Sequence, residues 1–174
     1  GIGPRPELPP PNQALLPTTQ IAPALGWAAC AAPQAAAGLR VTAFATELDH
    51  PRWLLVLPNG DVLVAESNAP PKPGAGFGFR AFVMGRAMKR AGAGVPSANR
   101  IHLLRDGDGD GVAETRSVFL SGLNSPFGMA LIGERLFVAN ADAVLVFPYR
   151  SGDTVIAAQG RKLVDLPGGP INHH

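Results

Sequence analysis

The sequence predicts an all-β fold. Glycine and proline are frequent, with 21 and 18 of the 174 residues, and they separate short apolar runs instead of gathering in one low-complexity block. The runs are rich in β-branched and aromatic residues, and turn signals such as PNGD and DGDGDG lie between them. Because 46% of the residues are hydrophobic and 16% are charged, the chain has enough apolar side chains for a folded core.

Seven apolar runs are expected to be strands or halves of hairpins. They begin after Leu39, where a segment rich in proline and alanine gives way to the short runs. That preceding segment, residues 1–38, shows neither helical nor strand periodicity, which predicts an extended arm or linker. The expected strands are residues 41–44, 53–57, 61–66, 100–104, 115–120, 135–141 and 143–149.

Two segments, residues 48–67 and 123–141, share one frame. Each begins with a leucine, two polar residues and a proline, and continues with an apolar run, a turn and a second run that ends in Val-Ala. Pro51 and Pro126, which are 75 residues apart, mark the same place in the two copies. A frame that recurs at a fixed distance indicates a repeat architecture.

The offset between the two copies locates an insertion in the first. It falls from 74 residues at Val64 to 43 residues at Ala98, so the first copy holds about 31 extra residues, within the segment 68–97. Without the insertion the repeat is about 44 residues long. That length suits the four-stranded blade of a β-propeller.

The same frame begins a third time at LPGGPINHH, because Pro170 lies 44 residues after Pro126. By register, His173 and His174 open the first strand of a third blade. The first strand of each blade lines the central channel of a propeller, so residues at its start converge on a mouth where ligands bind. Two blades and a fragment do not close a ring, so residues 39–174 are expected to be the N-terminal part of a larger propeller.

Three stretches together resemble a known family. They are LDHPRWLLVLPNGDVLVAE, NRIHLLRDGDGDGVAETRSVFLSGLNSPFGMAL and LVDLPGGPINHH. They resemble the sorbosone dehydrogenase branch of the soluble glucose/sorbosone dehydrogenases, over roughly residues 38–174. The resemblance implies a six-bladed β-propeller with bound pyrroloquinoline quinone (PQQ) and calcium. It also implies oxidation of a small sugar substrate, an aldose or a sorbosone-like aldehyde, in the periplasm.

The resemblance further implies a catalytic histidine at the start of a channel-lining strand. His174 matches this general base by spacing, with His173 as the alternative, because the residues that would separate the two follow position 174. An imidazole suits the chemistry, since removing a proton from a sugar hydroxyl needs a base that titrates near neutral pH. The other interpretation is that both histidines are polar residues at a strand end.

In the first copy of the repeat, the segment DHPRW holds the place equivalent to that of His173 and His174 in the third, at the start of the first strand. PQQ carries three carboxylates, for which an arginine fork is a good partner, and an indole face offers a stacking surface. Arg52 and Trp53 are therefore candidate quinone-binding residues. The alternative is that Trp53 packs between blades and Arg52 pairs with a carboxylate on the rim.

Asp106, Asp108 and Asp110 match the opening of a calcium loop, in which oxygens at alternate positions converge on the cation. The match with an EF-hand then fails, because Ser117 stands at the twelfth position and the flanking runs are expected to be strands. The sequence favours a hairpin at a blade edge that uses Asp-Gly turns. Weak surface calcium binding is the second interpretation.

The insertion 68–97 carries five basic residues and no acidic one. Apolar side chains recur at helical spacing over residues 79–91, which predicts a short amphipathic helix. This helix either docks on the propeller or lies on an anionic membrane, where an electron acceptor could reside. Nucleic acid is not an expected partner, because the basic residues are few and no series of aromatic side chains accompanies them.

Composition excludes some classes of protein. No apolar run is long enough to span a bilayer as a helix, and the single Cys30 cannot form an intrachain disulfide. Gly1 at the start indicates a processed or truncated N-terminus. Two functions then fit the sequence: a PQQ-dependent sugar dehydrogenase, or a non-catalytic propeller that acts as a binding module.

Overall fold

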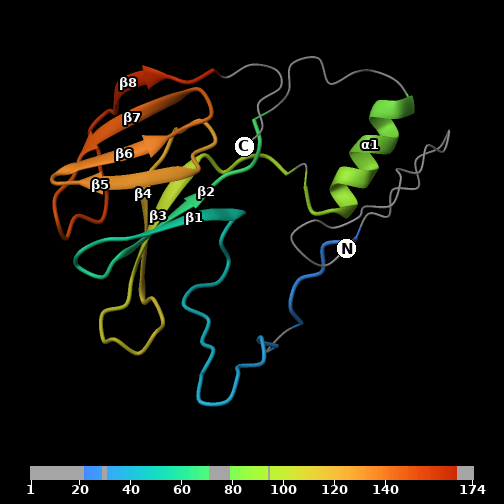
Figure 1. Cartoon of the computed structure of the whole chain (residues 1–174), viewed down its shortest axis with the longest axis horizontal. Coiled ribbons are helices and arrows are strands. Elements are labelled where there is room, and N and C mark those ends of the chain that lie inside the picture. The colour runs from blue at the N-terminus through green and yellow to red at the C-terminus, as the bar shows by residue number, and fades with distance from the viewer. Residues whose placement is uncertain (1–21, 29–30, 71–78, 94, 168–174) are drawn as a thin grey trace, which may run out of the picture.

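The structure is a computed structural model that describes residues 22–28, 31–70, 79–93 and 95–167 (Figure 1). Two four-stranded antiparallel sheets form the fold, which confirms the predicted all-β class. The first sheet contains β1 (Pro51–Val56), β2 (Val62–Glu66), β3 (Arg100–Arg105) and β4 (Thr115–Leu120), in that order. The second contains β5 (Gly128–Ile132), β6 (Arg135–Ala139), β7 (Ala143–Pro148) and β8 (Arg161–Asp165), also in chain order.

The two sheets repeat one pairing pattern, residue for residue. Leu54 pairs with Val64 in the first sheet, and Met129 pairs with Val138 in the second, as the sequence frame requires. A β-bulge interrupts the pairing of the third and fourth strands at the same point in both sheets. Each sheet is therefore one blade of a partial β-propeller, and the additional helix α1 (Phe79–Arg90) lies in the connection between β2 and β3.

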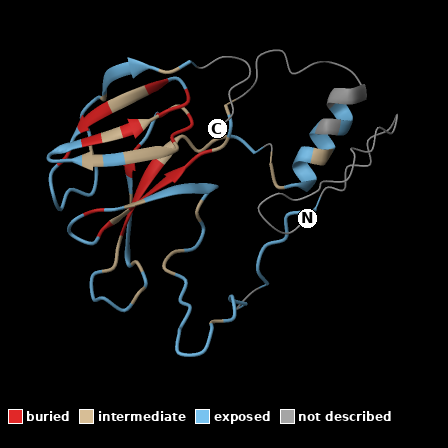
Figure 2. Cartoon of the chain, viewed as in Figure 1, coloured by how far each residue is buried: buried red, intermediate tan, exposed pale blue. Residues whose placement is uncertain are grey.

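The blades pack face to face, and β1 lies beside β5. Figure 2 shows the buried residues concentrated on the central strands of the two sheets, β2 and β3 in the first and β6 and β7 in the second. Alternate residues of a strand point to opposite faces of its sheet, so each blade contributes every second side chain to this core. The main core residues are Leu63, Ile101, Leu103 and Phe119 from the first blade and Leu136, Val138 and Phe147 from the second.

The two blades use opposite faces for this contact. Val138 packs in the core between the blades, whereas its repeat equivalent Val64 lies on the outer face of the first blade. Val64 itself is buried, but Leu54 and Val56, in the edge strand of that outer face, are 62% and 67% exposed. Because the contact is heterologous, the same rotation would place a further blade on each outer face, as in a propeller ring.

The structure corrects the expectation of a strand at residues 41–44. This segment is irregular, and Leu39 and Val41 are exposed. Phe44 accepts a backbone hydrogen bond from Ala113, 2.9 Å long, but no ladder of bonds forms. Strand propensity does not produce a strand here, because a strand also needs a partner along its length.

One strand, β8, is predicted neither by the seven apolar runs nor by the repeat frame, whose first apolar run in the second copy corresponds to β5. Its five residues, RKLVD, are exposed throughout and show no alternation of apolar and polar side chains. Pairing with β7 makes this segment a strand. It completes the second blade as its outermost strand.

The predicted helix is confirmed as α1. It lies away from both sheets (Figure 1), and Phe82 and Val83 are 63% and 48% exposed. Docking on the propeller is therefore not seen for the described side chains of the helix. Its described contact with the arm is a backbone hydrogen bond of 3.0 Å from Ala24 to Arg90. In the described part of the chain, no helix has the length and apolar character needed to cross a membrane.

Candidate functional site

Strand directions give each blade two ends. In the first blade, β1 and β3 start at one end and β2 and β4 finish there, and we call this end the mouth edge. The turns at residues 57–61 and 106–114 lie at the opposite end, the turn edge. A six-residue strand such as β3 rises about 17 Å, which separates the two edges. Residues 49–53, which include the predicted quinone-binding pair, lie at the mouth edge.

Arg52 occupies a β-bulge at the start of β1. Pro51 pairs with Glu66 and Trp53 pairs with Ala65, so Arg52 is an extra residue opposite this step of β2. Its side chain is exposed, and no carboxylate pairs with it in the described part of the chain. Bulges redirect side chains and are frequent next to active sites. The alternative in which Arg52 pairs on the rim is therefore not seen among these residues.

Trp53 is 53% exposed and does not belong to the buried core between the blades. Trp53 is therefore not one of the buried inter-blade residues in the described part of the chain, although it pairs with the core residue Ala65. Its ring is accessible at the start of the first strand, next to the bulge. An accessible indole and a guanidinium that has no carboxylate partner among the described residues are the kinds of group that can bind a flat anionic ligand.

The backbone just before each first strand is left-handed. His50 has a φ of 50° and its repeat equivalent Ser125 has a φ of 46°. Non-glycine residues adopt this region rarely, and their strain must be held by surrounding contacts. Ser67 donates a backbone hydrogen bond of 3.2 Å to His50, which ties the start of β1 to the end of β2.

A buried carboxylate lies beneath this turn. Glu66 is fully buried, and its Oε2 atom is 2.8 Å from Nδ1 of His102 and 2.5 Å from Nε of Arg100. Its Oε1 atom accepts a hydrogen bond of 2.8 Å from the backbone N–H of Asp49. The hydrogen bond to Glu66 raises the pKa of Arg100 above its ordinary value. A buried charge requires such pairing, because its desolvation is costly.

Sequence reasoning missed this cluster. The available signal was a charged residue at the end of an apolar strand run, with His102 and Arg100 on the next run. Glutamate and arginine are rarely buried without partners, so charges inside predicted core strands indicate a paired site. The pairing itself depends on the register of β2 against β3, which places Val64 opposite His102.

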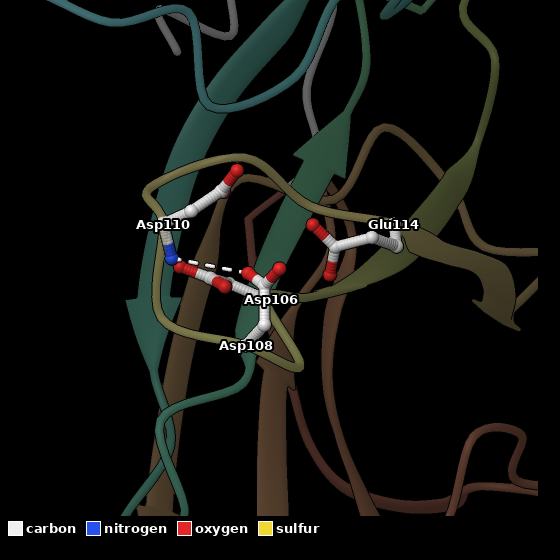
Figure 3. Close-up of side chains that lie close together, drawn as sticks. All are labelled: Asp106, Asp108, Asp110 and Glu114. Atoms are coloured by element: carbon white, nitrogen blue, oxygen red, sulfur yellow. Dashed lines mark hydrogen bonds between the residues drawn. The ribbon is translucent and has the colours of Figure 1, made fainter.

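The predicted hairpin at DGDGDG is confirmed, because the loop joins β3 to β4. One carboxylate oxygen from each of Asp106, Asp108, Asp110 and Glu114 lies within 4.8 Å of the others (Figure 3). Backbone N–H groups of the loop donate hydrogen bonds to these side chains. The bond from Gly111 to Asp106, 2.9 Å long, is the largest factor that lowers the pKa of Asp106.

This acidic loop lies at the turn edge, at the opposite end of the blade from Arg52 and Trp53. It therefore does not contribute ligands to a site at the mouth edge. A cavity of about 800 Å³ also lies toward the turn edge, on the second blade, where it is lined by residues such as Phe137 and Arg161. His173 and His174 lie outside the described residues.

Comparisons with known proteins agree with the fold. A family model described as a domain of unknown function (DUF7133) matches residues 80–164. No curated protein matches the chain. The chain is similar to the holo form of the pyranose dehydrogenase PQQ domain from Coprinopsis cinerea, with a TM-score of 0.53 and 16% sequence identity. The match covers 76% of this chain and 25% of that chain, so this chain spans a quarter of its length.

At this level of identity, the likeness shows the fold alone. It supports the fold of a PQQ domain. The narrower resemblance to the sorbosone dehydrogenase branch stays a prediction.

Proposed function

We propose that the protein is a PQQ-dependent oxidoreductase that oxidises an aldose or a sorbosone-like sugar aldehyde. The observation that carries the proposal is Arg52, exposed, unpaired among the described residues and presented by a β-bulge at the start of β1. The structural likeness to a PQQ domain supports it. The periplasm is the proposed location, on the basis of the sequence resemblance.

The residues at the mouth edge fit the quinone. Its carboxylates need cationic donors, and Arg52 offers a guanidinium fork without a competing carboxylate among the described residues. Trp53, the next residue in the chain, offers an accessible indole face on which the flat quinone could stack. When bound, the quinone accepts a hydride from the sugar carbon. In this proposal His174 takes the proton from the hydroxyl on that carbon, which is the anomeric hydroxyl of an aldose or a hydroxyl of the hydrated aldehyde, and Arg52 and Trp53 hold and orient the cofactor.

Reconstitution of the full-length protein with PQQ and calcium tests the proposal. We expect dye-coupled oxidation of one or more members of a panel of aldoses and sorbosone. A protein that binds PQQ without oxidising any sugar would favour the binding module. A protein that does not bind PQQ would overturn the proposal.

Arg52→Gln should weaken PQQ binding by about 10- to 100-fold, because a charged hydrogen-bond partner of a carboxylate is lost. Binding is measured by equilibrium dialysis of the full-length protein. Arg135→Gln is the matched control, since Arg135 is an exposed arginine at the turn edge of the second blade. Equal affinities in the two variants would exclude Arg52 from the quinone site.

Calcium binding at the acidic loop stays a prediction. If the loop of Asp106, Asp108, Asp110 and Glu114 binds calcium, we expect a weak site with a Kd of about 0.1 to 1 mM, because the loop is exposed. Calorimetric titration measures it, and Asp106→Asn should abolish the signal while Asp153→Asn, in another turn, should not. Absence of binding would leave a plain hairpin. Either result concerns a site separate from the quinone.

The exposed helix α1 is a proposed contact with an anionic membrane that holds the electron acceptor. Arg86 lies over the ring of Phe82, at 6.0 Å from its centroid, so basic and apolar groups are presented together. Basic side chains each contribute about 1 kcal/mol near an anionic surface, and salt screens this attraction.

We expect the full-length protein to bind vesicles that contain phosphatidylserine. Binding should weaken with added salt and with Arg86, Lys89 and Arg90 changed together to Gln, as measured by co-sedimentation. Neutral phosphatidylcholine vesicles are the control. Binding that is unaffected by salt and by the substitutions would contradict the proposal.

A further inference from the structure

Four side chains hold the segment that leads into β1, and we call them the Glu66 clamp: Glu66, Arg100, His102 and Arg116. Glu66 accepts a hydrogen bond from the backbone N–H of Asp49. Arg116 donates to the carbonyl oxygens of Thr46 and Glu47, at 3.1 and 2.8 Å, and its Nη2 atom lies 3.8 Å from Glu66. Arg100 bonds to both Glu66 and the carboxylate of Asp49. Residues 46–49 are therefore fixed to the blade by several charged contacts.

The second blade shows that the blade fold does not need this clamp. The repeat equivalents of Glu66, Arg100 and His102 are Asn140, Ala143 and Leu145. The second blade nevertheless forms the same strand ladders, and Ser125 adopts the same left-handed conformation as His50. The charged cluster is a feature of the first blade, and the frame common to both blades does not explain it.

The clamp acts on the residues next to Arg52. Pro51 pairs with Glu66 across the ladder, and Arg52 follows immediately in the bulge. Its equivalent in the second blade is Phe127, so the clamp and the exposed arginine occur together in the same blade. Buried ion pairs contribute little net stability over an apolar core, but they fix geometry when every member has a partner.

We propose that the Glu66 clamp is a positioning device for Arg52: it holds residues 46–50 so that the bulge presents the guanidinium at the mouth edge. The identity of the ligand that Arg52 binds rests on the proposed function. The existence of the clamp rests only on the hydrogen bonds and ion pairs of its four side chains. Its effect is on affinity for an anionic ligand, and its members do not need to touch that ligand.

The test uses Glu66→Gln in the full-length protein, with two readouts. Hydrogen exchange of the peptide 49–54 reports whether the segment is held, and we expect it to become about tenfold faster. Equilibrium dialysis of PQQ reports whether Arg52 is presented, and we expect an affinity loss of about tenfold, with no change in the exchange of β6 and β7. Arg116→Gln is the second variant, because it removes the contacts to residues 46–47 and leaves Glu66 paired with Arg100.

Asp61→Asn is the matched control. Asp61 is 2% exposed and accepts two hydrogen bonds of 2.7 Å from Arg105, so it is another buried carboxylate–arginine pair in the same blade, at the turn edge. We expect this variant to leave both the exchange of peptide 49–54 and PQQ affinity at wild-type values. A loss of affinity equal to that of Glu66→Gln would assign the effect to general destabilisation and overturn the proposal.

The remaining outcomes separate the clamp from the proposed function. Faster exchange with unchanged PQQ affinity would make the clamp purely structural and overturn the proposal. Unchanged exchange in both clamp variants would also overturn it. If the wild-type protein does not bind PQQ, the proposed function fails. The exchange comparison between the clamp variants and Asp61→Asn then decides by itself whether the clamp positions the bulge.

Discussion

In the full-length protein, His174→Ala should lower kcat for sugar oxidation by about 100- to 10,000-fold, the usual cost of losing a general base. Without the imidazole, no group at this position accepts the hydroxyl proton while the hydride leaves the carbon that bears this hydroxyl. Folding and PQQ affinity should stay near wild type, because a histidine at a channel mouth, where the repeat frame predicts His174, contributes little to core packing. The measurement is dye-coupled turnover at saturating PQQ, with affinity determined separately.

His173→Ala is the internal control for this prediction. We expect it to change kcat much less and to act, if at all, on PQQ affinity. The opposite ranking would move the general base to His173, one residue away in the frame. Wild-type turnover in both variants would exclude the general-base mechanism and leave the other interpretation of the two histidines.

Phe119→Ala should destabilise the folded protein by about 3 to 5 kcal/mol, the cost of removing a large buried aromatic side chain and leaving a cavity. Phe119 is fully buried in the core between the two blades, where side chains from both sheets surround it. The loss is measured by urea unfolding as a lower midpoint with an unchanged slope.

The neighbouring residue gives the control. Val118 is 44% exposed and its side chain points to the opposite face of β4, so Val118→Ala should cost well under half as much. Similar losses in the two variants would contradict the face-to-face packing of the blades. A loss of stability confined to Phe119→Ala would support the packing of one blade face against the next, which further blades of a propeller would repeat.

Much of the fold could be predicted because its signals are local. The continuous apolar run of β2 and the Asp-Gly turns between β3 and β4 can be recognised within a few residues. The repeat frame also located the insertion, because the offset between the two copies falls from 74 to 43 residues where the extra residues were added. The same repeat frame predicts that Arg52 and Trp53 lie at the start of a first strand. The pairing of Trp53 with Ala65 shows that this start lies at the mouth edge.

Other features depended on partners distant in the sequence. β8 is charged and exposed, so only its ladder with β7 makes it a strand, whereas residues 41–44 have strand propensity and no ladder. The acidic loop could be recognised from its sequence, but its position at the turn edge, away from Arg52, follows from the strand directions. A sequence motif carries no information about which end of a sheet it occupies until the topology is known.

The sequence by itself therefore determined the class of fold, the length of the repeated blade and the residue types at the mouth edge. The tertiary structure alone decided that the carboxylate of Glu66 meets Arg100, 34 positions later, and that Arg52 sits in a bulge beside it. The physical reason is that strand propensity and turn chemistry depend on residues that are neighbours in the sequence. The pairing of a buried charge is set by the register between strands, which depends on the packing of the whole sheet.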